Sequence, residues 1–337
     1  MKPVAFLEIS DWEKEYLKSF PEFLEIADLY SESLNEENVE RFSDYKVISC
    51  FISSQFTKEI IEKLPNLRLI STRSTGYDHI DVNYCKERGI NVAYVPSYGS
   101  HTVAEYTFGL LLCLIRKIYD AYHQVRESGL FNVENLTGRE LYSKTIGVIG
   151  TGRIGANVIK IAKGFEMKVL AYDKYPNEEL AKDLGFKYVS LEELLKNSDV
   201  ITFHVPYTSE THHLLNKDNI SLVKKGAYVI NTSRGGIIET EALFQALKSK
   251  QIGGAALDVL EEEGLIKEEQ ELLLKGAIKE PEKLKNMLLN IIFIDLDNVI
   301  VSPHNAFNTE EALQNLLATS IENITNFLKG NPLNLVP

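Results

Sequence analysis

The chain has 337 residues, which is more than one hydrophobic core usually serves, so two domains are expected. A composition of 44% hydrophobic and 25% charged residues indicates an ordinary globular protein, and the net charge of −12 argues against nucleic acid and anionic membranes as partners. Three widely spaced cysteines, Cys50, Cys85 and Cys113, form no disulfide framework and no metal-binding motif, so no metal site is predicted.

Two segments could in principle direct the chain to a membrane, and both are too short. The amino terminus contains several acids and only a brief apolar run, unlike a signal peptide. The longest apolar stretch, Phe108–Ile115, is far shorter than a membrane span. We therefore expect a cytoplasmic protein that does not contact a membrane.

The first hundred residues alternate short β-branched runs with amphipathic stretches, the pattern of an α/β domain with a parallel sheet. In residues 57–64, for example, Ile60, Ile61 and Leu64 share one helical face. The expected strands are Val4–Glu8, Lys46–Phe51, Leu67–Thr72 and Asn91–Val95.

A long helical pattern runs from Thr102 to Glu127, and its first half is apolar on nearly every side. A helix of this kind is normally buried between larger bodies. We interpret it as the crossing between two domains or as an oligomer interface. An ordinary core helix is an equally good interpretation of this segment taken alone.

A second, more regular series of β–α units begins at Lys144, as a doubly wound nucleotide-binding fold requires. The expected strands are Thr145–Ile149, Lys168–Asp173, Val200–Val205, Ala227–Asn231, Gly254–Val259 and Val299–Ser302. The charged, Leu-rich segment 261–297 has no strand pattern and predicts one or two surface helices in a long insertion. The last helical stretch, Glu310–Leu328, is expected to return to the first domain, because chain termini often lie close together.

The sequence TIGVIGTGRIG places Gly150, Gly152 and Gly155 in G-x-G-x-x-G spacing. The motif follows an apolar strand and opens a helix, and this context makes it far more specific than the glycines alone. Gly150 permits a tight turn, Gly152 lets backbone approach a diphosphate, and Gly155 allows close packing of helix on strand. The free N–H groups at the helix start would face the diphosphate.

The next expected strand ends at Asp173, where a ribose-binding carboxylate belongs in such a unit. A carboxylate there accepts hydrogen bonds from the ribose 2′-hydroxyl and repels a 2′-phosphate, so NAD is favoured over NADP. Lys174, directly after it, weakens that preference slightly. A turn-forming Asp at a strand end is the alternative for Asp173 alone, but strand, glycines and spacing together favour the nucleotide site.

Three polar residues follow strands of this second series: Arg234, Glu263 and His304. In open α/β sheets the ligand crevice lies at the carboxyl ends of the strands. Arg can grip a substrate carboxylate with two parallel hydrogen bonds, and a protonated His can supply a proton to a carbonyl oxygen that becomes negative as hydride arrives. A nearby Glu would stabilise the imidazolium and fix its orientation. Taken singly, each could instead be a solvated or structural side chain, and for Glu263 alone that interpretation is the better one.

Over nearly its whole length the chain resembles the D-isomer-specific 2-hydroxyacid dehydrogenase family, most closely its D-lactate dehydrogenase branch. The stretches that carry the resemblance are RSTGYDHID (73–81), VPSYGSHTVAE (95–105), GVIGTGRIG (147–155), HVPYTSETHHLLN (204–216), VINTSRGGIIE (229–239), ALDVLEEE (256–263) and SPHNAF (302–307). It implies that Arg234 binds the substrate carboxylate, that His304 is the acid/base, and that Glu263 is its partner. Because Glu261, Glu262 and Glu263 are contiguous, Glu261 stays open as the partner.

The resemblance also implies the residues of the binding sites. The cofactor would be contacted by Gly150, Gly152, Arg153, Ile154, Gly155, Asp173, Val205, Pro206, Thr211, Thr232, Ser233 and Asp258. The backbone of Thr75 and Gly76 would help to hold the substrate carboxylate, and Tyr98, Phe56 and Phe307 would be aromatic residues of the substrate pocket. The segment between Glu263 and His304 is longer than is usual in the family.

The implied architecture is two doubly wound parallel-sheet α/β domains with a cleft between them. A flavodoxin-like substrate domain would comprise residues 1–100 and 302–337, and a Rossmann NAD-binding domain residues 101–301. The implied activity is reversible hydride transfer between NADH and a small 2-keto acid such as pyruvate, in a homodimer that uses the helix at 102–127. Two rivals remain: an NAD(H)-sensing corepressor-like protein without activity, and a family dehydrogenase for glycerate, phosphoglycerate, formate or phosphite.

Overall fold

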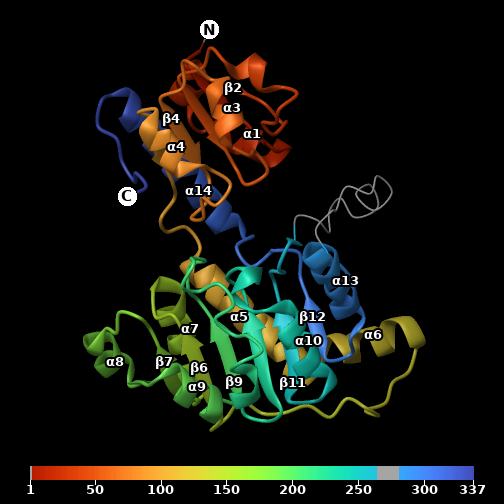
Figure 1. Ribbon diagram of the computed structural model, residues 1–337. Helices are drawn as coiled ribbons and strands as arrows, with labels where there is room; N and C mark the ends of the chain where they lie inside the picture. Colours follow the sequence, from red (N-terminus) through yellow and green to blue (C-terminus); the bar gives the residue numbers. More distant parts are fainter. Residues whose placement is uncertain (1, 264–280) are drawn as a thin grey trace. The chain divides into compact units, whose positions relative to one another are not determined.

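The computed structural model of the chain describes residues 2–263 and 281–337. It divides into two compact units, Met1–Gly99 with Asn308–Pro337 and Ser100–Phe307 (Figure 1). Each unit is built on one parallel sheet. The expected fold class, two parallel-sheet α/β domains, is therefore confirmed.

The first unit has a five-stranded parallel sheet in the order β2-β1-β3-β4-β5. The strands are β1 (Val4–Phe6), β2 (Ala27–Leu29), β3 (Val47–Cys50), β4 (Leu69–Thr72) and β5 (Asn91–Ala93). Its helices are α1 (Asp11–Leu17), α2 (Pro21–Ile26), α3 (Lys58–Glu62), α4 (Val82–Glu87) and α14 (Glu310–Leu328), with a 3₁₀ turn at Val39–Phe42. Strands β1, β3 and β4 are buried along their whole length, as expected for apolar runs covered on both faces.

The carboxyl-terminal helix α14 is part of this first unit, as the sequence predicts. Thr309 caps its start by accepting a hydrogen bond from the Ala312 N–H. Its buried face, including Leu317 and Ile324, packs in one core with residues of β1, β3 and β4. Burial of this apolar stripe explains why the helix docks on the sheet.

The second unit has a seven-stranded parallel sheet in the order β12-β11-β10-β9-β6-β7-β8. The strands are β6 (Thr145–Ile149), β7 (Lys168–Tyr172), β8 (Lys187–Tyr188), β9 (Val200–Phe203), β10 (Ala227–Asn231), β11 (Ile252–Leu257) and β12 (Val299–Val301). The strand order reverses between β6 and β9, and such a switch point is where doubly wound sheets bind ligands.

The helices described in the second unit are α5 (Ser100–Arg116), α6 (Ile118–Ser128), α7 (Arg153–Gly164), α8 (Glu178–Leu184), α9 (Leu191–Asn197), α10 (Thr240–Lys248) and α13 (Pro281–Asp295). This unit also has 3₁₀ turns at Ile220–Leu222 and Gly235–Ile237. Helix α13 lies within the segment expected to be helical, and the rest of that expected insertion, residues 264–280, lies outside the described residues. Among the described residues, no helix is both long and apolar enough to cross a membrane.

The single long helix expected at 102–127 is two helices. Helix α5 ends at Arg116, and Lys117 takes a left-handed conformation with φ of +54° before α6 begins. A left-handed residue cannot continue a right-handed helix, so the chain turns there. Helix α5 packs against α7, with Phe108 and Leu111 buried, whereas none of the residues of α6 is buried.

Candidate active site

The glycine loop between β6 and α7 has the shape that a diphosphate requires. Gly150 has a φ of +92°, and a Cβ atom added there would come within 2.5 Å of the His204 carbonyl oxygen. A Cβ at Gly155 would come within 2.0 Å of the Gly150 carbonyl oxygen, so helix and loop can pack this closely only with glycine. At Gly152, the cap of α7, an added Cβ would meet no atom within 4 Å. The backbone at the start of α7 is therefore not covered by a side chain, and its N–H groups are accessible to the diphosphate of a bound dinucleotide.

Asp173 follows β7 and is tied to the glycine loop. Its Oδ2 accepts hydrogen bonds from the Thr151 N–H at 2.7 Å and the Thr151 hydroxyl at 2.9 Å, and its Oδ1 accepts from the Tyr175 N–H at 2.9 Å. A carboxylate oxygen has two lone pairs, so Oδ1 can still accept from a ribose hydroxyl. Thr151 was not singled out from the sequence, although a hydroxyl between the first two glycines is a readable signal.

The other expected cofactor residues, apart from Asp258, come from the start of α7 and from the segments after β9 and β10. Thr211 closes the turn that follows β9, because its hydroxyl donates to the Pro206 carbonyl at 2.6 Å. Thr232 is buried after β10, with its hydroxyl 3.0 Å from that of Thr107 on α5. Arg153 and Ile154 open α7, Val205 lies next to Pro206, and Ser233 follows Thr232. All of them lie at the carboxyl end of the sheet, as the topology demands.

His304 and Glu263 form a hydrogen-bonded pair. His304 Nδ1 lies 2.8 Å from Glu263 Oε1, and both side chains retain some exposure. Burial raises the pKa of Glu263, but other groups lower it by more, so the pKa lies below its usual value. These groups are His304, through its hydrogen bond and its charge, the Leu260 N–H, and the charge of Arg234. Glu263 is therefore an anion near neutral pH.

Arg234 contributes to the same electrostatic environment. The three residues follow β10, β11 and β12, which are neighbours in the sheet, so their segments meet at one part of its carboxyl edge. The Arg234 guanidinium donates to the Ser233 carbonyl at 2.8 Å, and its charge contributes to the lowered pKa of Glu263. The structure thus brings together a guanidinium, a carboxylate and an imidazole.

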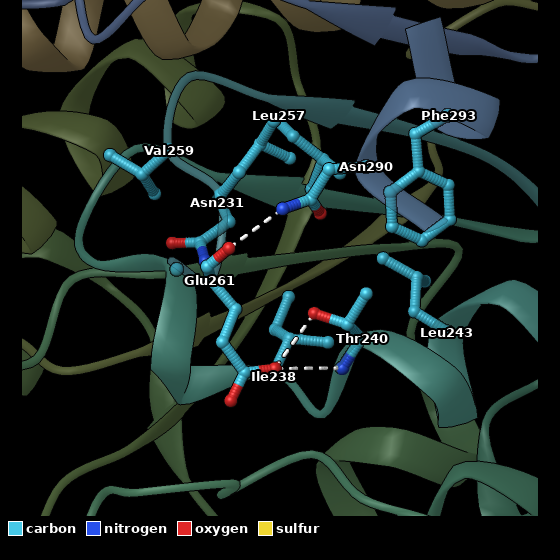
Figure 2. Close-up of a pocket in the computed structure, with 11 residues that line it drawn as sticks. Asn231, Ile238, Thr240, Leu243, Leu257, Val259, Glu261, Asn290 and Phe293 are labelled. Carbon is cyan, nitrogen blue, oxygen red and sulfur yellow. Dashed lines mark hydrogen bonds between the residues drawn. The ribbon is translucent and has the colours of Figure 1, made fainter. Parts of the chain in front are cut away.

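Glu261 points to different partners. Its Oε1 lies 2.7 Å from His213 Nε2, and its Oε2 accepts from the Thr240 hydroxyl at 2.7 Å. Its backbone carbonyl accepts from the side-chain amide of buried Asn290 at 2.7 Å. Figure 2 shows Glu261, Thr240 and Asn290 around a small cavity whose other walls include Leu243, Leu257 and Phe293. The carboxylate next to His304 is therefore that of Glu263.

Asp258, one of the expected cofactor residues, holds the turn that carries His304. It is fully buried, and its carboxylate accepts from the Ser302 hydroxyl at 2.5 Å and from the Asn305 and Ala306 N–H groups at 2.8 Å each. Its backbone carbonyl accepts from the His304 N–H at 2.8 Å. His304 has a φ of +53°, a conformation that non-glycine residues keep only where surrounding contacts enforce it. These contacts with Asp258 provide that enforcement.

The expected substrate residues divide between the two units. Thr75 and Gly76 follow β4 in the first unit, where the Thr75 hydroxyl donates to the Val95 carbonyl at 2.7 Å. Tyr98 belongs to the same unit and is half-buried, whereas Phe56 has no exposed surface and packs in the hydrophobic core of that unit. Phe307, in the second unit, lies with its ring 6.3 Å from that of His304.

One buried histidine near the site and the absence of a metal-binding cluster among the described residues also bear on its chemistry. His204 follows β9, and burial lowers its pKa to about 3, so its ring is neutral. In the described part of the chain, no group of three or more His, Cys, Asp or Glu side chains could hold a metal ion.

Comparison with known proteins gives one consistent result. The family model of the D-isomer specific 2-hydroxyacid dehydrogenase NAD-binding domain matches residues 108–306. A 2-hydroxyacid dehydrogenase homolog of Zymomonas mobilis is 37% identical over 90% of this chain and 89% of its own, and the D-lactate dehydrogenase of Escherichia coli is 34% identical over 97% of each chain. The crystal structure of D-lactate dehydrogenase from Aquifex aeolicus, complexed with NAD and lactic acid, is similar with a TM-score of 0.85 and 37% identity, over 97% of this chain and 96% of that one.

Proposed function

Because this chain belongs to the D-isomer-specific 2-hydroxyacid dehydrogenase family, whose cofactor is NAD, we propose that it catalyses the reversible reduction of pyruvate to D-lactate. The observation that carries the proposal is the pair formed by His304 and Glu263 within reach of the charge of Arg234. When bound, NADH supplies the hydride. The side chains of this protein bind the keto acid and donate or accept the proton at its C2 oxygen.

In the proposed reaction His304 is the proton donor to the C2 oxygen of the keto acid. Its Nδ1 is engaged by Glu263, so the proton available for transfer is the one on Nε2. The anionic Glu263 stabilises the imidazolium before transfer and fixes the plane of the ring. In the reverse direction the neutral imidazole takes the proton from the D-lactate hydroxyl.

Arg234 is the proposed partner of the substrate carboxylate. A guanidinium offers two parallel N–H groups to a carboxylate and keeps its charge at any physiological pH. Gripping the carboxylate orients C2 toward the hydride donor, and such orientation can supply a large part of the rate enhancement. The backbone of Thr75 and Gly76 is proposed to share the carboxylate, and Tyr98 and Phe307 to favour a small apolar C3 group.

The direct test is reduction of a panel of keto acids by NADH: pyruvate, glyoxylate, 2-ketobutyrate and 2-ketoisocaproate, with hydroxypyruvate as the precursor of glycerate. We expect the highest kcat/KM with pyruvate and a product that is D-lactate and not L-lactate. A higher kcat/KM for another keto acid would make that acid the proposed substrate and would leave the proposed reaction unchanged. Tight NADH binding with no turnover of any acid would instead favour a sensor that has no activity.

We also propose that the chain is a cytoplasmic homodimer. The described cysteines are all unpaired, as a reducing compartment requires. The support for a dimer lies in α6 and the segment after it, where Tyr119, Phe131 and Val133 expose 59%, 93% and 84% of their surface. Large apolar side chains gathered in one short segment usually mark an interface, and a second copy of the chain is the proposed partner.

A further inference from the structure

Lys174 and Glu210 form an ion pair beside the expected ribose site. The Lys174 ammonium lies 2.5 Å from Glu210 Oε2, and both side chains are exposed. Lys174 directly follows Asp173, and its ammonium also lies 5.6 Å from the centre of the Tyr175 ring. The pKa of Lys174 is raised, chiefly by the hydrogen bond to Glu210, so the lysine is a cation already engaged by a carboxylate.

The pair joins two segments that lie on either side of the glycine loop. In the sheet, β6 lies between β7 and β9 (Figure 1). Lys174 comes from the segment after β7 and Glu210 from the segment after β9. An ion pair between them therefore crosses the carboxyl edge of the sheet at β6, beside the loop that fits the diphosphate.

Glu210 is presented by a turn with its own hydrogen bonds. The Thr211 N–H donates to the Thr208 carbonyl at 3.1 Å, and the Thr208 N–H donates to the Thr211 hydroxyl at 2.8 Å. The Thr211 hydroxyl in turn donates to the Pro206 carbonyl. These contacts order the backbone around Glu210, so its carboxylate can meet Lys174 at a smaller entropic cost than in a mobile loop.

We propose that Glu210 is a specificity-determining residue for the cofactor, which keeps Lys174 from accepting the 2′-phosphate of NADP. A dinucleotide site accommodates that phosphate when a cation lies near the strand end. Here the one candidate directly after Asp173 is neutralised by Glu210. Asp173, Lys174 and Glu210 together carry one net negative charge, which repels the phosphate and leaves a ribose hydroxyl unaffected.

The test compares the binding of NADH and NADPH, which differ only in the 2′-phosphate. Dissociation constants are measured by calorimetry, without a keto acid, for the wild type and for Glu210→Gln, Lys174→Gln and the double variant. We expect Glu210→Gln to improve the affinity for NADPH relative to NADH by about fivefold, the upper end for an exposed charge pair. Lys174→Gln should show no such gain.

The double variant isolates the role of Lys174. If the gain comes from a released ammonium, Glu210→Gln should give less than about a twofold improvement when Lys174 is already Gln. Glu192→Gln, which removes the carboxylate of the exposed pair with Lys196 on α9, is the matched control and should leave the NADPH to NADH ratio unchanged.

Either of two results would overturn the proposal: an unchanged ratio in Glu210→Gln, or an equal gain in the Lys174→Gln background. The proposal rests on NAD binding and not on the substrate. Because binding is measured without a keto acid, its failure is distinguishable from a failure of the pyruvate assay.

Discussion

Two acidic side chains only two positions apart, Glu261 and Glu263, have entirely different partners. Between them Glu262 has a φ of +58°, and this left-handed residue turns the chain sharply. Glu261 is thereby directed to Thr240 and His213, and Glu263 to His304. A single turn of the backbone thus decides which carboxylate meets the imidazole.

This difference predicts different pH profiles for two otherwise similar variants. The lowered pKa of Glu263 keeps it ionised across the assay range, so Glu263→Gln removes a full negative charge beside His304. Without that charge the imidazolium is less stabilised, so the pH profile of pyruvate reduction should move to lower pH. Steady-state rates between pH 5.5 and 9 measure this. Glu261→Gln should leave the position of the profile unchanged, and identical shifts in both variants would refute the assignment.

Arg234 is expected to act on the keto acid and not on the cofactor. Arg234→Gln removes the cation that would hold the substrate carboxylate, so KM for pyruvate should rise and kcat should fall, each by about tenfold or more. The dissociation constant of NADH should change little, because the cofactor does not need this guanidinium. Kinetics close to those of the wild type would remove Arg234 from the site.

These residues also show what the sequence could and could not predict about the site. Arg234, His304 and the three glycines are found from their motifs, because each follows a recognisable strand. The choice between Glu261 and Glu263 depends on a left-handed residue that is not glycine, which no local pattern announces. The hydrogen bonds of Asp258 to the 302–306 turn could not be predicted for a similar reason, because they join residues more than forty positions apart.

At the scale of elements, the strands of the second sheet that the sequence predicts are close to those observed, because long apolar runs between turn residues are strong signals. Strands β2 and β8 were missed: β2 has three residues and follows α2 with no intervening loop, and β8 has two. Such strands exist because a neighbouring strand pairs with them. The break at Lys117 was missed because it carries no glycine, proline or asparagine.

The junction of β6 and α7 allows a matched pair of substitutions within one helix. Gly155→Ala places a Cβ against the Gly150 carbonyl, so α7 must move away from the loop. We expect a lower melting temperature and at least about tenfold weaker NADH binding, because the helix start no longer faces the diphosphate. Gly164→Ala, at the other end of α7, meets no atom within 4 Å and should be neutral or stabilising by up to about 1 kcal/mol. Equal effects of the two changes would contradict the packing argument.

At the scale of the whole molecule, the distribution of apolar surface is uneven. Helix α5 buries many of its apolar side chains, including Phe108 and Leu111, whereas no residue of α6 is buried. The exposed apolar side chains of α6 and of the segment that follows it are Ile118, Tyr119, Tyr122, Val125, Leu130, Phe131, Val133 and Tyr142. Water contact with so many large apolar groups in one stretch is unfavourable, and a second copy of the chain would remove it.

The dimer proposal predicts a mass by light scattering of twice 38.1 kDa for the wild type at micromolar concentration. Phe131→Glu combined with Val133→Glu puts two charges where apolar surface would be buried, so the mass should fall to that of one chain. Because neither residue is buried within the chain, the two substitutions should not lower the melting temperature of the single chain. Trp12→Glu, an exposed aromatic residue on α1 of the first unit, is the control and should leave the mass unchanged. A wild type with the mass of one chain, or a double variant that stays paired, would show that this surface has another partner or none.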